Sequence, residues 1–332
     1  MKRRVVLAGG GHAHLSVLAG WANHHGDRDQ RWLVTSGPFT AYSGMLPGWL
    51  EGNYRARDLF IDLRPLAAQA GAELVLADAV GLDAAKSRLT LSSGDELDYD
   101  LLSIATGGEP DSASLAALGQ RLIPAKPVPA FMERWETFLA ASSFVPCPHV
   151  GVVGGGAAGV ELALAIHAAL HRHFARGRVS LVSAEGQFLA GHAEGVRHRA
   201  LAELGERGIA VHHATAVGTE RGLLLSDGSN LELDCVVAAT GSRAPQWLGR
   251  SGLACNADGF ILVGPDLRSR SHPMIFAAGD IVERTDRKVA RSGVHAVKAG
   301  PVLAANLRAQ LEGRPLRPYL PRRRTLYLLS TG

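Results

Sequence analysis

The chain contains 332 residues, enough for two domains that each bury a core of their own. Hydrophobic residues make up 46% and charged residues 20% of the chain, a balance that excludes a disordered or fibrous protein. The net charge of +4 is mild for this length and does not predict nucleic-acid binding. No stretch is apolar for the length that a membrane span needs.

Neither the cysteines nor the histidines have the arrangement of a typical metal site. The cysteines form no CxxC pair, so they predict neither a disulfide framework nor a zinc centre, and their use fits a reducing cytoplasm: Cys147, Cys235 and Cys255. Three histidines have helical spacing on an alanine-rich segment, and we interpret them as solvated or packed side chains: His167, His171 and His173. We therefore predict no metal site.

One pattern of residues occurs twice along the chain. An apolar run rich in β-branched residues precedes a glycine cluster, an alanine- and leucine-rich helix and a second apolar run, over Arg4 to Thr35 and again over Val150 to Ser183. Each segment is typical of a βαβ unit, in which a helix connects two parallel strands. The sequence therefore predicts an α/β protein with two three-layer domains.

The second glycine cluster, Gly154-x-Gly156-x-x-Gly159, is the stronger dinucleotide-binding motif. Its glycines permit a tight turn, a close approach of the backbone to a pyrophosphate, and close packing of helix and strand. The helix N-terminus that follows favours phosphate through its N–H groups and dipole. The first cluster has His14 in place of the third glycine, so we expect its helix to lie slightly farther from its strand.

Short strands and turns follow each βαβ unit and lead to an apolar strand that ends in Ala-Thr-Gly, at residues 105–107 and 239–241. Prolines bracket one helix, Phe131 to Ala140, which marks the crossover between the domains. A later strand ends in Gly279-Asp280, and its carboxylate can accept hydrogen bonds from a sugar-like hydroxyl. The next helix runs from Gly293 to Leu307, and its N-terminal dipole can stabilise negative charge on a bound ring.

Five motifs follow one another along the chain, namely the two glycine clusters, the two Ala-Thr-Gly strand ends and the strand that ends in Gly279-Asp280. Their order resembles the pyridine nucleotide-disulfide oxidoreductase superfamily over nearly the whole chain. More narrowly, GGGHAH at 9–14, YSGMLPG at 42–48 and GPVLAANL at 300–307 resemble the branch fused or linked to selenide, water dikinase. Type II NADH:quinone dehydrogenases are similar more distantly. The resemblance implies a glutathione-reductase-like fold with two Rossmann-like domains. The FAD-binding domain would comprise 1–115 and 242–318, the NAD(P)H-binding domain 116–241, and a truncated C-terminal interface module would begin at 319–332, with a strand over 325–329.

The resemblance also implies two cofactors, FAD and NAD(P)H. FAD would contact the first glycine cluster and the nearby strand and helix ends, at Gly9, Gly11, His12, Ala13, Thr35, Ser36, Ala79, Val80, Ala105, Thr106, Gly107, Gly279, Asp280, Gly293 and Val294. NAD(P)H would contact Gly154, Gly156, Gly159, Ser183, Glu185, Thr240 and Gly241. Hydride would pass from the nicotinamide to the flavin, and the candidate catalytic residues are Glu161, His295 and Lys298.

The chain departs from the superfamily pattern in ways that affect function. The redox cysteine pair of disulfide reductases is absent, which argues against dithiol chemistry and against sulfide:quinone oxidation. The ribose-binding acid is replaced by Thr35 or Ser36 at the FAD site and by Ser183 at the nicotinamide site. Glu185 would repel a 2′-phosphate, so NADH is favoured over NADPH. Val294 and Lys298 stand where type II dehydrogenases have glutamines near quinone, which puts quinone reduction in doubt.

The sequence therefore predicts an FAD-dependent NAD(P)H oxidoreductase without a redox disulfide, whose acceptor, a quinone or a selenium compound among others, is open. The alternative is a flavin-binding regulatory or interaction module with little turnover. A link to selenide, water dikinase follows from the resemblance alone, and homodimer formation and peripheral membrane attachment are left open.

Overall fold

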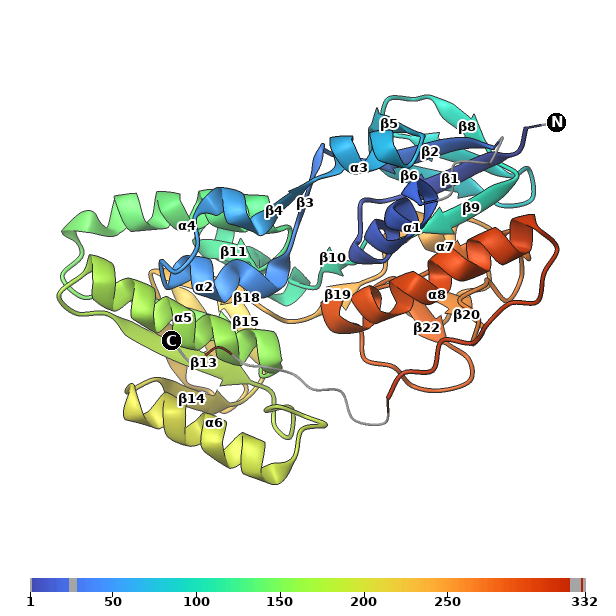
Figure 1. The fold of residues 1–332 in the computed structure, drawn as a ribbon. Coiled ribbons are helices and arrows are strands. Elements are labelled where there is room, and N and C mark those ends of the chain that lie inside the picture. Colours follow the sequence, from blue (N-terminus) through green and yellow to red (C-terminus); the bar gives the residue numbers. More distant parts are fainter. Residues whose placement is uncertain (1, 24–28, 323–329, 331–332) are drawn as a thin grey trace. The chain divides into compact units, whose positions relative to one another are not determined.

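Each predicted βαβ segment lies at the centre of a five-stranded parallel sheet in the computed structural model, which describes residues 2–23, 29–322 and 330 (Figure 1). The two sheets belong to separate compact units. The first unit comprises Met1–Thr40, Phe60–Glu109 and Ser242–Leu326, and the second comprises Ala41–Leu59, Pro110–Gly241 and Tyr327–Gly332. This division differs from the predicted domains, because residues 41–59 and 110–115 group with the second unit.

The sheet of the first unit has the strand order β21-β9-β1-β2-β5, and all its strand pairs are parallel. Its strands are β1 (Arg4–Ala8), β2 (Gln30–Thr35), β5 (Ala72–Leu76), β9 (Leu101–Ile104) and β21 (Ile275–Ala277). A parallel sheet is covered on both faces, which explains why Val5 to Ala8 is a continuous apolar run. Val5 and Leu7 pack into one core cluster, and Val6 and Ala8 pack into another.

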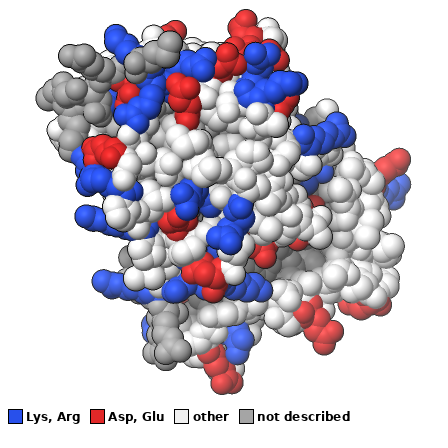
Figure 2. Space-filling model, turned by 90° about the vertical axis from the view of Figure 1, so that its right-hand side faces the viewer, with Lys and Arg blue, Asp and Glu red and all other residues white. Residues whose placement is uncertain are grey.

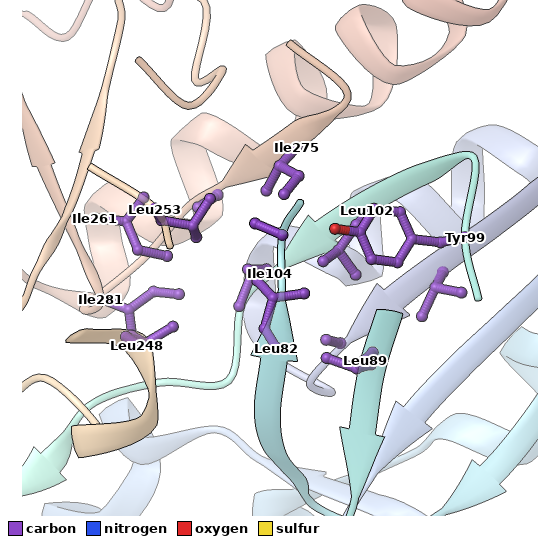
Figure 3. Close-up of a cluster of buried hydrophobic side chains, with 14 of the residues drawn as sticks. Leu82, Leu89, Tyr99, Leu102, Ile104, Leu248, Leu253, Ile261, Ile275 and Ile281 are labelled. Carbon is purple, nitrogen blue, oxygen red and sulfur yellow. The ribbon is translucent and has the colours of Figure 1, made fainter. Parts of the chain in front are cut away.

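Helices cover one face of this sheet and a β-meander covers the other. The helices α1 (His12–Ala22), α3 (Leu63–Gln69) and α8 (Gly293–Leu311) pack with Val5 and Leu7. On the opposite face, Figure 3 shows apolar side chains of the meander and of β9 converging with Ile261 and Ile281. The meander consists of β6 (Ala79–Asp83), β7 (Arg88–Leu91) and β8 (Glu96–Asp98), all antiparallel. The predicted three-layer α/β architecture is thereby confirmed.

Shorter elements complete the first unit. The strands β20 (Ile261–Val263) and β22 (Val282–Arg284) form a parallel pair, and α7 (Gln246–Gly249) follows β19 (Ser242–Arg243). Two short ladders form at the ends of the segments that make up the units. One pairs β3 (Phe39–Ala41) with β4 (Phe60–Asp62), and the other pairs β10 (Glu109–Pro110) with β19. Tyr319, the first residue of the predicted C-terminal module, is buried in the helix-side core of the first unit. The strand expected over 325–329 lies outside the described residues.

The second unit repeats the design with the strand order β11-β18-β12-β13-β14. Its sheet comprises β11 (Leu122–Pro124), β12 (His149–Val153), β13 (Arg178–Ser183), β14 (Ala210–His213) and β18 (Cys235–Ala238), again all parallel. An antiparallel meander of β15 (Ala216–Thr219), β16 (Gly222–Leu225) and β17 (Asn230–Glu232) packs its leucines against this sheet. The order β18-β12-β13-β14 and the meander therefore match β9-β1-β2-β5 and the meander of the first unit. The outermost strand differs, because β11 precedes its βαβ unit in the chain whereas β21 follows its own.

The helices of the second unit are α2 (Leu46–Leu50), α4 (Val128–Ala141), α5 (Ala157–His173) and α6 (Glu194–Glu206), with 3-10 turns η1 (Ser43–Met45), η2 (Ala56–Leu59), η3 (Ala113–Arg121) and η4 (Ser142–Phe144). The helix α4 starts three residues before the predicted Phe131, because Pro127 precedes it as N-cap. Among the described residues, no helix is long and apolar enough to cross a bilayer. On the face shown in Figure 2, basic and acidic side chains are interspersed.

Candidate functional site

The first glycine turn joins the end of β1 to the start of α1. Gly9 has a φ of 101°, a conformation that side chains disfavour. A Cβ on Gly9 would lie 2.5 Å from the carbonyl oxygen of Ala105, and a Cβ on Gly11 would also collide with that oxygen. The helix begins at His12 with Gly11 as N-cap, and no side chain caps it. Its first-turn amides, which include that of Ala13, therefore form an N-terminus suited to an anion.

His14 occupies the position of the missing third glycine and is fully buried. Its Nδ1 lies 2.6 Å from the carbonyl oxygen of Gly9, and its Nε2 lies 2.9 Å from Oγ of Ser103 on β9. Burial lowers the pKa of His14 to about 4, so the imidazole is neutral at physiological pH. Ser103 was missed by the sequence reasoning, although a polar residue inside the apolar run Leu101–Ile104 was a signal for it.

Thr35 lies directly beneath the first turn. It is 8% exposed, and a Cβ on Gly10 would lie 2.9 Å from its Oγ1, so its hydroxyl faces the turn. Ser36 follows at the surface. The amide of residue 77 donates to the Thr35 carbonyl, which brings the start of β6, Ala79 and Val80, to this end of the sheet. The structure thus places Thr35 against the glycine turn and brings the other three predicted cofactor contacts to the same end of the sheet.

The strand ends predicted to contact FAD leave the sheet at the same edge. Residues Ala277 and Ile104 are register partners, so Thr106 and Gly107 after β9 lie beside Gly279 and Asp280 after β21. Gly107 has a φ of 78°, and a Cβ added there would meet no atom within 4 Å, so its surroundings are open. This edge holds the carboxyl ends of the strands, where open α/β sheets bind their ligands.

The helix α8 begins beside this edge and packs tightly on α1. Ser292 caps it through the amide of His295, and Gly293 is its first residue. A Cβ on Gly300 would lie 2.5 Å from Oγ of Ser16 and 3.0 Å from the carbonyl oxygen of Ala13, so the two helices leave no room for a methyl group. The contact is made near the N-terminus of α1 and within the first turns of α8.

Of the catalytic candidates, His295 lines a pocket at the start of α8. Its Nδ1 lies 3.1 Å from the hydroxyl of Tyr319, and burial, together with the charge of Lys298, lowers its pKa. The main chain of Tyr319 accepts a hydrogen bond of 2.7 Å from Arg284, which pairs with Asp286. The pocket is further lined by Gly279, Ala290, Arg291, Ser292 and Ala296. Lys298 is exposed, and Val294 is half-buried.

The second glycine turn has the same construction between β12 and α5. Gly154 has a φ of 131°, and a Cβ there would collide with the carbonyl oxygen of Ala239. A Cβ on Gly159 would collide with the carbonyl oxygen of Gly154. Gly156, the uncapped N-cap of α5, is exposed and has nothing within 4 Å of an added Cβ. Two of these glycines are therefore required by the fold, whereas Gly156 is not.

The predicted ribose contacts at the end of β13 differ in accessibility. Ser183 is fully buried beneath Gly155 and donates a hydrogen bond to the carbonyl of Ala184. Its hydroxyl is therefore enclosed by the protein beneath the glycine turn. Glu185 is exposed two residues later. At the end of β18, Thr240 donates to the carbonyl of Asp111, while Gly241 has a φ of 99° in open surroundings.

Glu161 lies on α5 in the second unit, two residues after Gly159. Its Oε1 accepts a hydrogen bond of 3.0 Å from the amide of Ser330, whose hydroxyl donates to Glu51 at 2.9 Å. Burial raises the pKa of Glu161, and the nearby charge of Glu51 adds to this shift. A carboxyl group whose pKa is raised in this way is better suited to proton transfer than an ordinary glutamate.

The segment 41–59 packs on α5, which explains why it groups with the second unit. Arg172 of α5 donates a hydrogen bond of 2.9 Å to the carbonyl of Leu50 at the end of α2. Gly52 has a φ of 83°, and a Cβ there would lie 2.6 Å from the Arg172 guanidinium. A cation at a helix C-terminus is favourable. This pairing joins residues 122 positions apart and was not predicted.

The cysteines and the histidines that the structure describes show no metal or dithiol arrangement. All three cysteines are free, and burial raises the pKa of the Cys235 and Cys255 thiols, which makes them poor nucleophiles. His171 Nδ1 contacts the carbonyl of His167, within α5. Among the residues that the structure describes, no group of His, Cys, Asp or Glu could hold a metal ion.

Two glycine turns, each opening an uncapped helix at the carboxyl edge of a parallel sheet, define a protein with two dinucleotide-binding units. The chain belongs to the pyridine nucleotide-disulphide oxidoreductase family, whose model matches residues 3–300. Membership confirms the family that the order of the sequence motifs predicted.

Curated relatives include dehydrogenases and quinone reductases. An NADH dehydrogenase-like protein of Mycobacterium tuberculosis is 29% identical over 233 residues, 67% of this chain and 58% of the relative. The demethylphylloquinone reductase of Synechocystis is 26% identical over 282 residues, 80% of this chain and 69% of the relative. The chain thus spans just over half the length of the mycobacterial relative.

Solved structures share the fold at low sequence identity. A NAD-dependent persulfide reductase from A. fulgidus has a TM-score of 0.81 at 22% identity, over 96% of this chain and 61% of that chain. The sulfide:quinone oxidoreductase of Aquifex aeolicus has a TM-score of 0.80 at 18% identity, over 94% of this chain and 78% of that chain.

Proposed function

We propose that the chain binds FAD on the Gly9 turn and NAD(P)H on the Gly154 turn, and transfers electrons to a small acceptor. The observation that carries the proposal is the shared construction of the two turns. In each unit, a Cβ added to the first glycine of the turn would collide with the carbonyl oxygen of the alanine in an Ala-Thr-Gly strand end, Ala105 or Ala239. One chain therefore holds two phosphate-binding turns of the same kind.

The residues of the first unit fit FAD. The N-terminus of α1 would receive the diphosphate, and Asp280 would accept hydrogen bonds from the ribityl hydroxyls. The N-terminus of α8, at Gly293 and Val294, would place positive dipole against the pyrimidine edge of the ring. Bound FAD supplies the electron-accepting ring, while the protein binds it, orients it and tunes its charge. His295 and Lys298 are the polar groups of α8 proposed to act there.

The second unit fits NAD(P)H. The open surroundings of Gly156 allow a diphosphate to approach the backbone, and the N-terminus of α5 would stabilise its charge. Glu185 is exposed at the end of β13, where it would accept from the ribose 2′-hydroxyl and repel a 2′-phosphate. NADH is therefore the preferred donor. Glu161 is proposed to act near the nicotinamide.

The acceptor is proposed to be a quinone, and reduction does not pass through a dithiol. The names of the Synechocystis relative and of a type II NADH:quinone oxidoreductase from Haemophilus influenzae support a quinone. A selenium compound, with a selenide, water dikinase as partner, is the second candidate, supported by the GGGHAH, YSGMLPG and GPVLAANL segments. Peripheral membrane association would be compatible with a quinone acceptor, and the proposed localisation is otherwise cytoplasmic, with a homodimer as a further proposal.

Anaerobic spectra of the purified protein test the proposal. We expect a yellow protein whose visible flavin absorbance is bleached rapidly by NADH, more slowly by NADPH, and restored by an added quinone. Bleaching without reoxidation by quinones but with reoxidation by a selenium compound would favour the second acceptor. A yellow protein that ignores both nicotinamides would refute the enzyme, and a folded protein that takes up no FAD would refute the flavin site.

A further inference from the structure

The two glycine turns differ at one matched pair of positions. The third glycine of the motif is Gly159 in the second turn and His14 in the first. On the neighbouring strand, the residue in register with Val152 is Val237, whereas the residue in the same place of the first sheet is Ser103. A glycine and a valine are thus exchanged together for a histidine and a serine. Each turn serves as an internal control for the other.

In the second turn, the carbonyl of the first glycine explains the need for Gly159. That carbonyl oxygen, on Gly154, lies where a Cβ at residue 159 would be placed. In the first turn, the equivalent carbonyl of Gly9 instead accepts a hydrogen bond of 2.6 Å from Nδ1 of His14. The side chain of His14 therefore bonds to the carbonyl with which a side chain at residue 159 of the second turn would collide.

The hydrogen bonds of His14 determine its tautomer. The Gly9 carbonyl can only accept, so Nδ1 carries the proton, and Nε2 accepts from the Ser103 hydroxyl at 2.9 Å. Both side chains are fully buried. Removing either one leaves a buried polar group of the other without its partner, which costs more than the bond itself contributes. Replacing both with apolar residues leaves no such group.

We propose that His14 and Ser103 together are positioning residues that replace the third glycine and hold the first turn in the shape that receives the diphosphate of FAD. The proposal rests on the FAD site proposed above. The chain of contacts runs from β9 through Ser103 and His14 to the Gly9 carbonyl, and hence to the amides at the start of α1. The shape of the first turn can therefore be changed by substituting a side chain that does not contact the cofactor. The second turn has a glycine and a valine at these two positions and offers no such side chain.

A double-mutant cycle on FAD affinity tests the proposal. The variants are His14→Gly, Ser103→Val and the double variant, which reproduces the residues of the second turn; FAD binding is followed by flavin fluorescence on reconstitution. Each single variant is expected to weaken FAD binding at least tenfold, and the double variant to weaken it less than the product of the two single effects. His14→Asn, whose amide can donate to the Gly9 carbonyl, is expected to recover part of the affinity lost in His14→Gly.

Controls separate this inference from the flavin site itself. NADH binding, followed by its own fluorescence, should stay within about twofold in all variants, since the second turn is unchanged. Effects that multiply in the double variant, or unchanged FAD affinity in folded His14→Gly, would overturn the proposed pairing. If His14→Gly does not fold, Ser103→Ala and His14→Asn carry the same test. Folded wild-type protein that binds no FAD would refute the FAD site instead, and the cycle measured on urea unfolding would still test the pairing.

Discussion

Replacing Gly156 with alanine should separate nucleotide binding from folding. Gly156 has a φ of −76° and a ψ of 177°, which alanine adopts without strain, and an added Cβ meets no atom within 4 Å. The free energy of unfolding should therefore change by no more than about 0.5 kcal/mol. The new methyl group would instead occupy space that the diphosphate needs near the start of α5.

The size of the effect follows from the hydrogen bonds at risk. A hydrogen bond between a backbone amide and a charged group contributes about 1.5–3 kcal/mol. At about 1.4 kcal/mol per tenfold, losing one such bond should raise the KM for NADH about 10- to 100-fold. Steady-state kinetics measures this change, flavin content shows that the first unit is intact, and urea unfolding reports stability.

Gly159→Ala is the matched control for this experiment. Its methyl group would collide with the Gly154 carbonyl inside the protein, so it should destabilise the second unit by about 1–3 kcal/mol. The reasoning fails if Gly156→Ala destabilises the protein as much as Gly159→Ala does. It also fails if Gly156→Ala leaves both stability and the KM unchanged, because the nucleotide then does not approach this backbone.

Three further predictions address specificity, pH and the thiols. Glu185→Arg should shift the ratio of kcat/KM values toward NADPH at least tenfold, whereas Ser183→Ala, at a buried hydroxyl, should leave that ratio unchanged; equal effects would contradict the assignment. The Arg284 guanidinium lowers the pKa of Asp286 below 3.8, so the stability from this ion pair is present above that pH and is lost as pH falls through the lowered pKa. Urea unfolding at several pH values should show a smaller acid loss in Asp286→Asn, and an unchanged acid loss would argue against this cause. Replacing all three cysteines with alanine should preserve NADH oxidation, and loss of activity in a folded variant would indicate thiol chemistry.

Features that depend on residues close in sequence were predictable. The two βαβ units, both glycine turns, the meanders and the helix after Gly279-Asp280 followed from periodicity and from turn residues, and the structure confirms them. Glycine at Gly154 and Gly159 is required because backbone atoms fill the space around it. Such steric demands leave a local trace in the sequence, namely the spacing of the motif.

Features that depend on distant partners were not predictable. His14 and Ser103 are 89 residues apart, and each has an ordinary local explanation until the other is placed beside it. The grouping of residues 41–59 with the second unit likewise rests on Arg172 and Leu50, which no periodicity connects. The expected contribution of Ser183 to ribose binding illustrates the same limit, since its burial depends on how closely Gly155 packs above it.

The contact of α1 with α8 bears on how the first unit would accept its cofactor. Because Gly300 leaves no room for a methyl group between α8 and the chain at Ala13 and Ser16, we expect the two helices to keep their relative position. Their positively polarised N-termini are then preorganised at a constant separation before any ligand arrives. Little conformational entropy would be lost on binding, so the cofactor-free protein should keep its shape and take up FAD again after it has been stripped.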